Sequence, residues 1–225
     1  MVENFVCSDL NEDLINLWNL IKNNPEKICL SYSKMWNKLI QLSIEEKKEY
    51  FYMVRNRFNK YKDSCDFMFI MRTTTNGMPR YNLSGNFNNS FHVTRNGMNP
   101  NKLNKIIVEW SDDLNKNNVQ FLCQSYSDIK NTEYNDIIYL DPPYANTKGM
   151  YYGTIDYEDL WNWMRISKGI KYLSFDGKTT YDNFTQIVPK DLYKKHEYLQ
   201  SGNSSFRRVI GKSSSTNVYE SLYTI

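Results

Sequence analysis

The sequence predicts a mixed α/β fold in which strands alternate with helices and two antiparallel strands end the chain. Four short apolar runs have the length of strands, and they span residues 5–7, 119–123, 137–140 and 170–175. Amphipathic segments with helical spacing lie between these runs. Two alternating segments, about 196–200 and 217–223, are joined by a long polar loop near the end of the chain. We therefore expect an α/β sheet with one reversed strand.

Two predicted helices occupy the first part of the chain. The first follows Ser8-Asp9, and its apolar face is expected to carry Leu10, Leu14, Trp18 and Ile21. The second begins at a capping box formed by Ser43 and Glu46 and extends to about Tyr61. Its apolar face is expected to carry Phe51, Val54 and Phe58.

Two further helices are predicted later in the chain. Pro100 precedes one of them, whose inward face is expected to carry Leu103, Ile106, Ile107, Trp110 and Leu114. Asp156 is the expected N-cap of the other, over about 157–168. Residues 73–94 have the composition of a loop and a hairpin. We expect residues 31–100 to form an inserted domain, and residues 1–30 and 101–225 to form the main domain.

Composition limits the classes of partner. The 225 residues suffice for a full core, and the net charge is only +3, so any charge that holds nucleic acid must be local. Four scattered cysteines and two histidines show no metal-ligand spacing, so we expect no metal site and a reducing cytosol. Cys7 and Cys123 lie in apolar runs and are expected in the core. No signal peptide or membrane-length apolar run is visible, which indicates a cytoplasmic protein with no membrane partner.

The most informative motif is Asp141-Pro142-Pro143-Tyr144, directly after the apolar run 137–140. Open α/β sheets place their active sites at the carboxyl ends of strands. A carboxylate and the Pro142 carbonyl can each accept an N–H of an exocyclic amino group, which positions its nitrogen for attack on a sulfonium methyl group. Tyr144 offers a flat face for a base flipped out of a duplex. The alternative is an ordinary turn, since Pro-Pro is common in loops.

Two other segments have both a functional and a structural interpretation. Asp9 ends the first predicted strand, where an acid can hold the ribose of a nucleotide cofactor, but it also suits a helix cap together with Glu12. The segment 76–88 places Arg, Tyr, Asn and Phe on a glycine-turned hairpin that can contact DNA. A solvated polar hairpin is the alternative. The basic face with Arg55, Arg57, Lys60 and Lys62 is equally ambiguous.

Together these segments resemble the Dam-type (D12 class, group alpha) family of DNA adenine-N6 methyltransferases. The resemblance runs from about residue 5 to the C-terminus, and its pieces follow the family's order. They are Val6 to Asn11 with Leu14-Ile15, Arg80-Tyr81-Asn82 with Gly85-x-Phe87-Asn88, Phe121 to Asp128, and Asp141 to Tyr144. The resemblance implies a Rossmann-like sheet that binds S-adenosylmethionine, and a target-recognition insertion that binds double-stranded DNA.

The resemblance also implies roles for individual residues. Asp141, Pro142 and Tyr144 would be catalytic. The cofactor would contact Asp9, Leu10, Ser125, Tyr126 and Asp141. DNA would contact Asn76, Arg80, Tyr81, Asn82, Phe87 and Asn88.

One part of the family pattern has no counterpart in residues 1–225. The family begins with a Lys-bearing segment and a first strand that ends in Phe-x-Gly-x-Gly, and eight residues without glycine precede Asp9 here. That strand would lie centrally, between the strands of Val6 and Ile138. Three hypotheses follow: a split enzyme, in phage or bacteria, whose first strand comes from a second polypeptide or a homodimer; a pseudoenzyme that binds DNA or protein; or a sheet that closes directly around an altered pocket.

Overall fold

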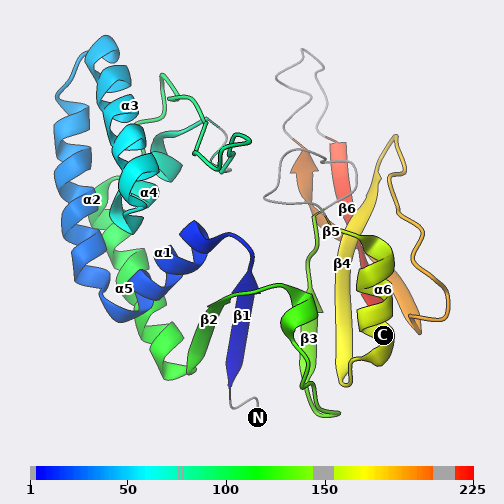
Figure 1. Ribbon diagram of the computed structural model, residues 1–225. Coiled ribbons are helices and arrows are strands. Elements are labelled where there is room, and N and C mark those ends of the chain that lie inside the picture. Colours follow the sequence, from blue (N-terminus) through cyan, green and yellow to red (C-terminus); the bar gives the residue numbers. More distant parts are fainter. Residues whose placement is uncertain (1–3, 76, 78, 144–154, 205–215) are drawn as a thin grey trace. The chain divides into compact units, whose positions relative to one another are not determined.

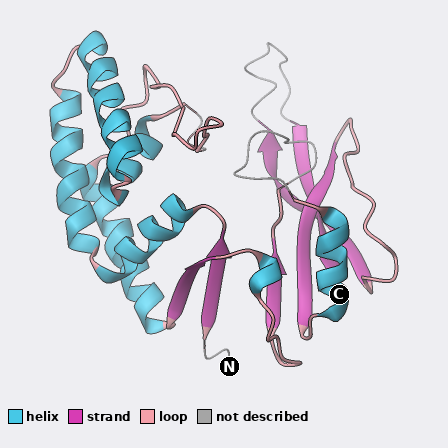
Figure 2. Cartoon of the chain, in the orientation of Figure 1, coloured by secondary structure: helices cyan, strands magenta, loops and turns pink. Residues whose placement is uncertain are grey.

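The computed structural model describes residues 4–75, 77, 79–143, 155–204 and 216–225, and Figure 1 traces them. The chain forms two compact units, Met1–Ser125 and Tyr126–Ile225. Figure 2 shows helices and strands in both, so the predicted mixed α/β fold with parallel and antiparallel strands is confirmed. No helix in the described part of the chain is long and apolar enough to cross a membrane.

The first unit is mainly helical. Its elements are β1 (Phe5–Asp9), α1 (Glu12–Asn23), α2 (Pro25–Ile40), α3 (Ile44–Tyr61), α4 (Ser64–Thr73), α5 (Pro100–Lys116) and β2 (Val119–Cys123). The Ser43–Glu46 capping box begins α3 as predicted, because each residue bonds the other's backbone N–H. Proline is the first residue of both α2 and α5, where its missing N–H costs nothing.

One aromatic-rich core holds this unit together. Phe51, Val54 and Phe58 of α3 are fully buried, as predicted, and they pack with residues of α1, α2, α4 and α5. The helices of segment 31–100 therefore share a core with α1 and α5. The domain boundaries at 31 and 100 stay a prediction.

Strands β1 and β2 form a two-stranded parallel sheet, with Phe5 opposite Val119 and Asp9 opposite Cys123. All five residues of β1 are exposed. The expectation that Cys7 and Cys123 lie in the core was wrong, since both are exposed. Leu10 and Trp110, expected to face inward, are also half-exposed. For Cys7 and Cys123 the physical reason is that a two-stranded sheet offers little surface under which side chains can be covered.

The second unit contains the 3-10 helix η1 (Tyr126–Asp128), β3 (Ile137–Leu140), α6 (Tyr157–Ile166), β4 (Ile170–Thr179), β5 (Lys195–Ser204) and β6 (Thr216–Thr224). Its four-stranded sheet has the order β3-β4-β6-β5. Strands β3 and β4 are parallel, and β6 is antiparallel to both of its neighbours. The predicted terminal hairpin and reversed strand are therefore confirmed.

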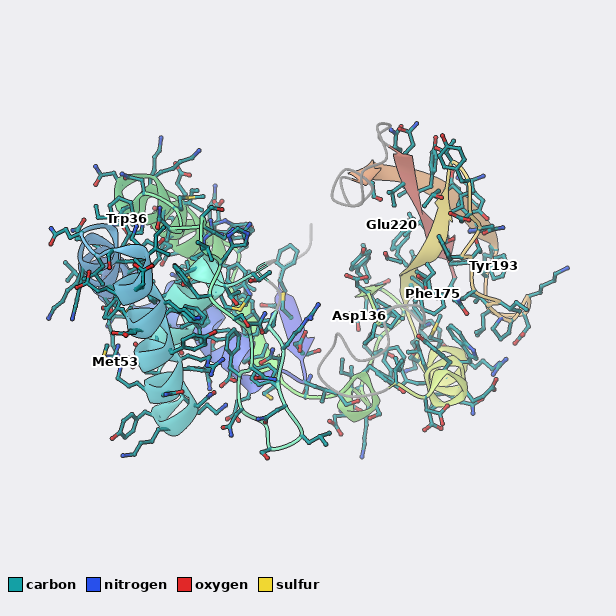
Figure 3. The ribbon with its side chains drawn as sticks, turned by 90° about the horizontal axis from the view of Figure 1, so that it is seen from above. Trp36, Met53, Asp136, Phe175, Tyr193 and Glu220 are labelled. Carbon is teal, nitrogen blue, oxygen red and sulfur yellow. The ribbon has the colours of Figure 1, made fainter. Side chains whose placement is uncertain are left out.

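Helix α6 packs on this sheet next to β4 (Figure 1). The interface contains Trp161 of α6 and Phe175 of β4, whose ring centroids lie 6.2 Å apart; Figure 3 labels Phe175. The predicted N-cap Asp156 is confirmed, because its side chain accepts from the N–H groups of Glu158 and Asp159. Strand β4 runs four residues beyond its predicted end. At Gly177 on this extension, any Cβ would overlap the Tyr219 carbonyl oxygen, so only glycine fits.

Both units leave a strand edge without a partner in the described part of the chain. There β1 pairs with β2 alone, and β3 pairs with β4 alone. One face of β3 carries exposed apolar side chains, since Ile137 is 60% and Tyr139 is 64% exposed.

Candidate active site

The motif Asp141-Pro142-Pro143 follows the last residue of β3, at the carboxyl end of two parallel strands. Leu140 is opposite Leu173, and β4 continues from there through the buried residues Ser174, Phe175 and Asp176. Asp141 is exposed, and the two prolines are partly exposed. The carboxylate and the Pro142–Pro143 backbone thus lie where open α/β sheets bind their ligands. Tyr144, predicted to stack on a base, lies outside the described residues.

A side chain that sequence reasoning missed contacts this motif. The Tyr157 hydroxyl donates a hydrogen bond of 2.8 Å to the Pro143 carbonyl oxygen. The Tyr157 ring stacks on Trp161 at 5.9 Å and meets Phe175 edge-on at 5.3 Å. Burial, and then the charge of Asp176, raise the pKa of the Tyr157 phenol. The aromatic spacing of Tyr157 and Trp161 signals a helix face, but nothing in it identifies the partner Pro143.

Asp9 is the last residue of β1 in the first unit, and Leu10 follows it directly. The Asp9 Oδ1 accepts from the backbone N–H of Asn11 at 2.7 Å. The N-cap of α1 is Asn11, so the alternative interpretation of Asp9 as the helix cap was wrong. Asp9 is exposed and Leu10 is 50% exposed, so a carboxylate and an apolar side chain stand next to each other on the surface.

Ser125 and Tyr126 follow β2 along the chain. Tyr126 begins η1, and its ring meets Trp163 of α6 edge-on at 5.8 Å. Burial, followed by the charges of Asp159 and Asp156, raises the pKa of Tyr126. Tyr126 and Asp141 belong to the second unit, whereas Asp9, Leu10 and Ser125 belong to the first.

The candidate DNA-contacting residues lie on a tight hairpin of the first unit. Tyr81 and Phe87 form an isolated antiparallel bridge, and Asn82 closes the turn by accepting from the N–H groups of Ser84 and Asn86. Arg80, Asn82 and Asn88 are exposed. Leu83 at the tip is fully exposed. Asn76 lies outside the described residues.

Two predicted contact residues are engaged inside the protein. Phe87 is 1% exposed, and its ring packs edge-on against Phe58 and Phe67. This corrects its assignment as a DNA-facing side chain: the ring anchors the hairpin in the core. Tyr81 is partly buried and donates a hydrogen bond of 2.8 Å to the Asp13 carboxylate.

The basic face of α3 is also largely used within the molecule. Arg57 forms a two-point contact with the buried Asp66, and Arg55 donates to the Asn89 carbonyl oxygen at 3.0 Å. Lys62 is the C-cap of α3, and its ammonium group contacts the Gly85 carbonyl oxygen at 3.3 Å. Arg57 therefore ties α3 to α4, whereas Arg55 and Lys62 hold the hairpin segment against α3. Within the described ranges, no cluster of three side chains could hold a metal ion.

The sequence is similar to known DNA methyltransferases. Residues 1–216 match the D12 class N6 adenine-specific DNA methyltransferase family. A Type II methyltransferase, M.MjaIII, of Methanocaldococcus jannaschii is 32% identical over 149 residues, which are 62% of this chain and 50% of that protein. The DNA adenine methylase of Vibrio cholerae is 30% identical over 148 residues, or 64% of this chain and 50% of the methylase.

A more distant match is the Type II methyltransferase M.FokI of Planomicrobium okeanokoites, which is 28% identical over 148 residues. The matched part spans about half the length of the first two relatives. Because the family match covers nearly the whole sequence, from the first residue through β3, α6 and β4 to the start of β6, this chain belongs to the D12 class N6 adenine-specific DNA methyltransferases.

Proposed function

We propose that this protein transfers a methyl group to the N6 amino group of an adenine that is flipped out of double-stranded DNA. The observation that carries the proposal is the position of Asp141-Pro142-Pro143 at the carboxyl end of β3, in a chain of this family. The methyl donor that the family uses is S-adenosylmethionine, which supplies an electrophilic methyl group when bound.

The residues of the motif suit the demands of this chemistry. An exocyclic amino group is a weak nucleophile because its lone pair is delocalised into the ring. The Asp141 carboxylate and the Pro142 carbonyl would each accept one of its N–H groups, which orients the nitrogen and keeps its lone pair available. Tyr144 would stack on the flipped base.

The proposed cofactor contacts come from surfaces whose chemistry fits. Asp9 is an exposed carboxylate that can accept from ribose hydroxyls, and the neighbouring Leu10 offers apolar surface to an adenine ring. Ser125, Tyr126 and Asp141 are the other proposed cofactor contacts. Asp141 would also attract the donor's ammonium group.

The proposed DNA contacts are Asn76, Arg80, Tyr81, Asn82 and Asn88. The exposed Arg80 can donate to a guanine edge or to a phosphate, and the exposed asparagines can bond base edges. The core ring of Phe87 and the contacts of Asn59 and Lys62 support the hairpin rigidly. A rigid hairpin holds these side chains in place for recognition.

We further propose that a second polypeptide, or a second copy of this chain, completes the cofactor site. Support comes from β1 and β3, each of which has a single strand partner among the described residues. An open edge with exposed apolar residues, such as Ile137 and Tyr139, is a template for strand addition. Backbone hydrogen bonds to the added strand would provide the affinity for the second polypeptide, and every second side chain of that strand would provide the specificity.

A methyl-transfer assay tests the proposal. Tritiated methyl groups should pass from S-adenosylmethionine to a duplex that contains adenine, and mass spectrometry should find N6-methyladenine. The assay is run on the chain alone and on the chain co-expressed with polypeptides encoded beside it. Asp141→Ala should lower the rate at least about 100-fold. Asp112→Ala, on the exposed face of α5, is the matched control and should keep the wild-type rate.

Other outcomes contradict parts of the proposal. Full activity of the purified monomer would refute the requirement for a second polypeptide. Activity that appears only when the chain self-associates would identify a homodimer. No methyl transfer and no calorimetric binding of S-adenosylmethionine under any of these conditions would refute the enzyme. A gel shift with steep salt dependence would then identify a DNA-binding pseudoenzyme, and no shift would indicate a protein-binding one.

A further inference from the structure

We propose that Tyr157 is a positioning residue, which orients the Pro142 carbonyl by binding the neighbouring Pro143 carbonyl. The inference rests on the proposed function, because it assigns a role within that same motif. Its basis is the hydrogen bond of 2.8 Å from the Tyr157 hydroxyl to the Pro143 oxygen, within one compact unit.

The Tyr157 ring is held in place by its position at the start of α6 and by two aromatic neighbours. Tyr157 is the first residue of α6, directly after the N-cap Asp156, whose carboxylate bonds two backbone N–H groups. Its ring stacks nearly parallel on Trp161, with 19° between the planes, and Phe175 meets it edge-on. Phe175 and Trp161 are themselves buried, at 1% and 4% exposure. The hydroxyl is therefore presented to Pro143 by a rigid support.

The motif needs such an external anchor because of its own covalent structure. Neither Pro142 nor Pro143 has a backbone N–H, so these two residues can be fixed through the backbone only by their carbonyl oxygens. The proline ring locks φ of Pro143, which leaves ψ as its single soft torsion. A bond to the Pro143 carbonyl restrains that torsion. The Pro142–Pro143 peptide plane, which carries the Pro142 carbonyl, is then fixed relative to α6.

The bond requires a protonated phenol, and the surroundings favour one. Burial against Trp161 and Phe175 disfavours the phenolate, and the nearby Asp176 carboxylate adds repulsion, so the pKa of Tyr157 lies above its usual value. Tyr157 is thus a stable donor at neutral pH. A general base at this position would need the opposite shift, so the chemistry fits a structural donor and does not fit a proton acceptor.

The contact can be tested without cofactor or DNA. Pro143-Tyr144 is the only Pro-Tyr dipeptide in the sequence. Labelling with ¹³C-carbonyl proline and ¹⁵N-tyrosine therefore gives a single carbonyl–amide correlation in the NMR spectrum, which reports on the Pro143 carbonyl. Tyr157→Phe keeps the ring and removes the hydroxyl. Loss of the donor should move the Pro143 carbonyl resonance upfield, whereas Tyr134→Phe, at a residue that is 78% exposed, should leave it unchanged.

The role in catalysis is measured on the active wild-type assembly. Tyr157→Phe should lower kcat about tenfold and leave KM for DNA unchanged, because a neutral hydrogen bond that orients the acceptor is lost. Its thermal unfolding midpoint should fall by only a few degrees, since all ring contacts remain and one neutral hydrogen bond is lost.

Each result is decisive. An unmoved carbonyl resonance overturns the contact, and a moved resonance with wild-type kcat overturns the positioning role. Lower kcat with raised KM also overturns it, because that pattern indicates a substrate contact. If the wild type, alone and with co-expressed polypeptides, neither transfers methyl groups nor binds S-adenosylmethionine, the proposed function and the catalytic role are both refuted. The carbonyl resonance is measured independently of activity, so it shows whether the contact itself exists.

Discussion

The Asn59 side chain forms a reciprocal pair of hydrogen bonds with the backbone of Phe87. The Phe87 N–H donates to Asn59 Oδ1 at 2.8 Å, and Asn59 Nδ2 donates to the Phe87 carbonyl oxygen at 3.1 Å. The asparagine amide thereby makes the two backbone hydrogen bonds that a paired residue on a neighbouring strand would make. It satisfies both polar backbone groups of a residue whose ring is in the core, and this fixes the hairpin of residues 80–88 to α3.

Replacing Asn59 with Ala should destabilise the protein by about 1–3 kcal/mol, because it leaves the Phe87 N–H and carbonyl without their partners. Urea unfolding measures the change, and hydrogen exchange at the Phe87 amide should quicken more than exchange in α2. Asn56→Ala, on the exposed face of the same helix, is the matched control and should change stability little. Equal effects of the two substitutions would contradict the bracing role.

Replacing Arg57 with Met should cost about 2 kcal/mol of unfolding free energy. The Asp66 carboxylate is 5% exposed and pairs with Arg57, whose guanidinium lies 2.6 Å from it through Nε. Losing the cation leaves a buried charge unpaired, but solvent reaches the half-exposed Arg57, so the cost falls below that of a fully buried pair. Chemical denaturation checks this. If Asp66→Asn in addition to Arg57→Met restores no stability, the buried carboxylate is not the cause.

Replacing Arg80 with Ala should weaken DNA binding and lower the slope of log affinity against log salt by about 1. Arg80 is exposed, and its backbone N–H is held by the Asn89 side chain at 2.7 Å, so the change leaves the hairpin in place. Fluorescence anisotropy over a salt series measures both quantities. Lys105→Ala on α5, at a side chain that is 78% exposed, should leave the slope unchanged.

Stability should fall as the pH drops below about 6.5, the ordinary value for histidine. The His196 ring stacks on Tyr223 at 4.3 Å, and burial, followed by the charge of Lys178, lowers its pKa. Above that pH His196 is neutral in both states. Below it the unfolded chain takes up a proton first, so unfolding is favoured down to the lowered pKa of the folded state.

The measurement is urea unfolding between pH 7 and pH 5 on the wild type and on His196→Phe, which keeps an aromatic ring on Tyr223. The difference in stability between the two proteins should change over this range. A constant difference would exclude His196 as the source of the pH dependence.

Local chemistry made several elements predictable from the sequence. The Ser43–Glu46 capping box and the Asp156 cap each act over three residues, so their helix starts follow from nearby side chains alone. The mixed α/β class was predictable from the alternation of strand-length apolar runs with amphipathic helical segments, because both patterns are local. The position of Asp141-Pro142-Pro143 after β3 was also predictable, because the apolar run ends directly before it.

Tertiary structure decided which of these residues are covered and which contact each other. Cys7 and Cys123 lie in apolar runs and Trp110 lies on a predicted apolar helix face, but all three are exposed, whereas Phe87 lies in a polar hairpin but is buried. The contacts of Tyr157 with Pro143, and of Asn59 with Phe87, join segments 14 and 28 residues apart. Periodicity reports only the local backbone, whereas burial and such contacts depend on which distant segment packs against it.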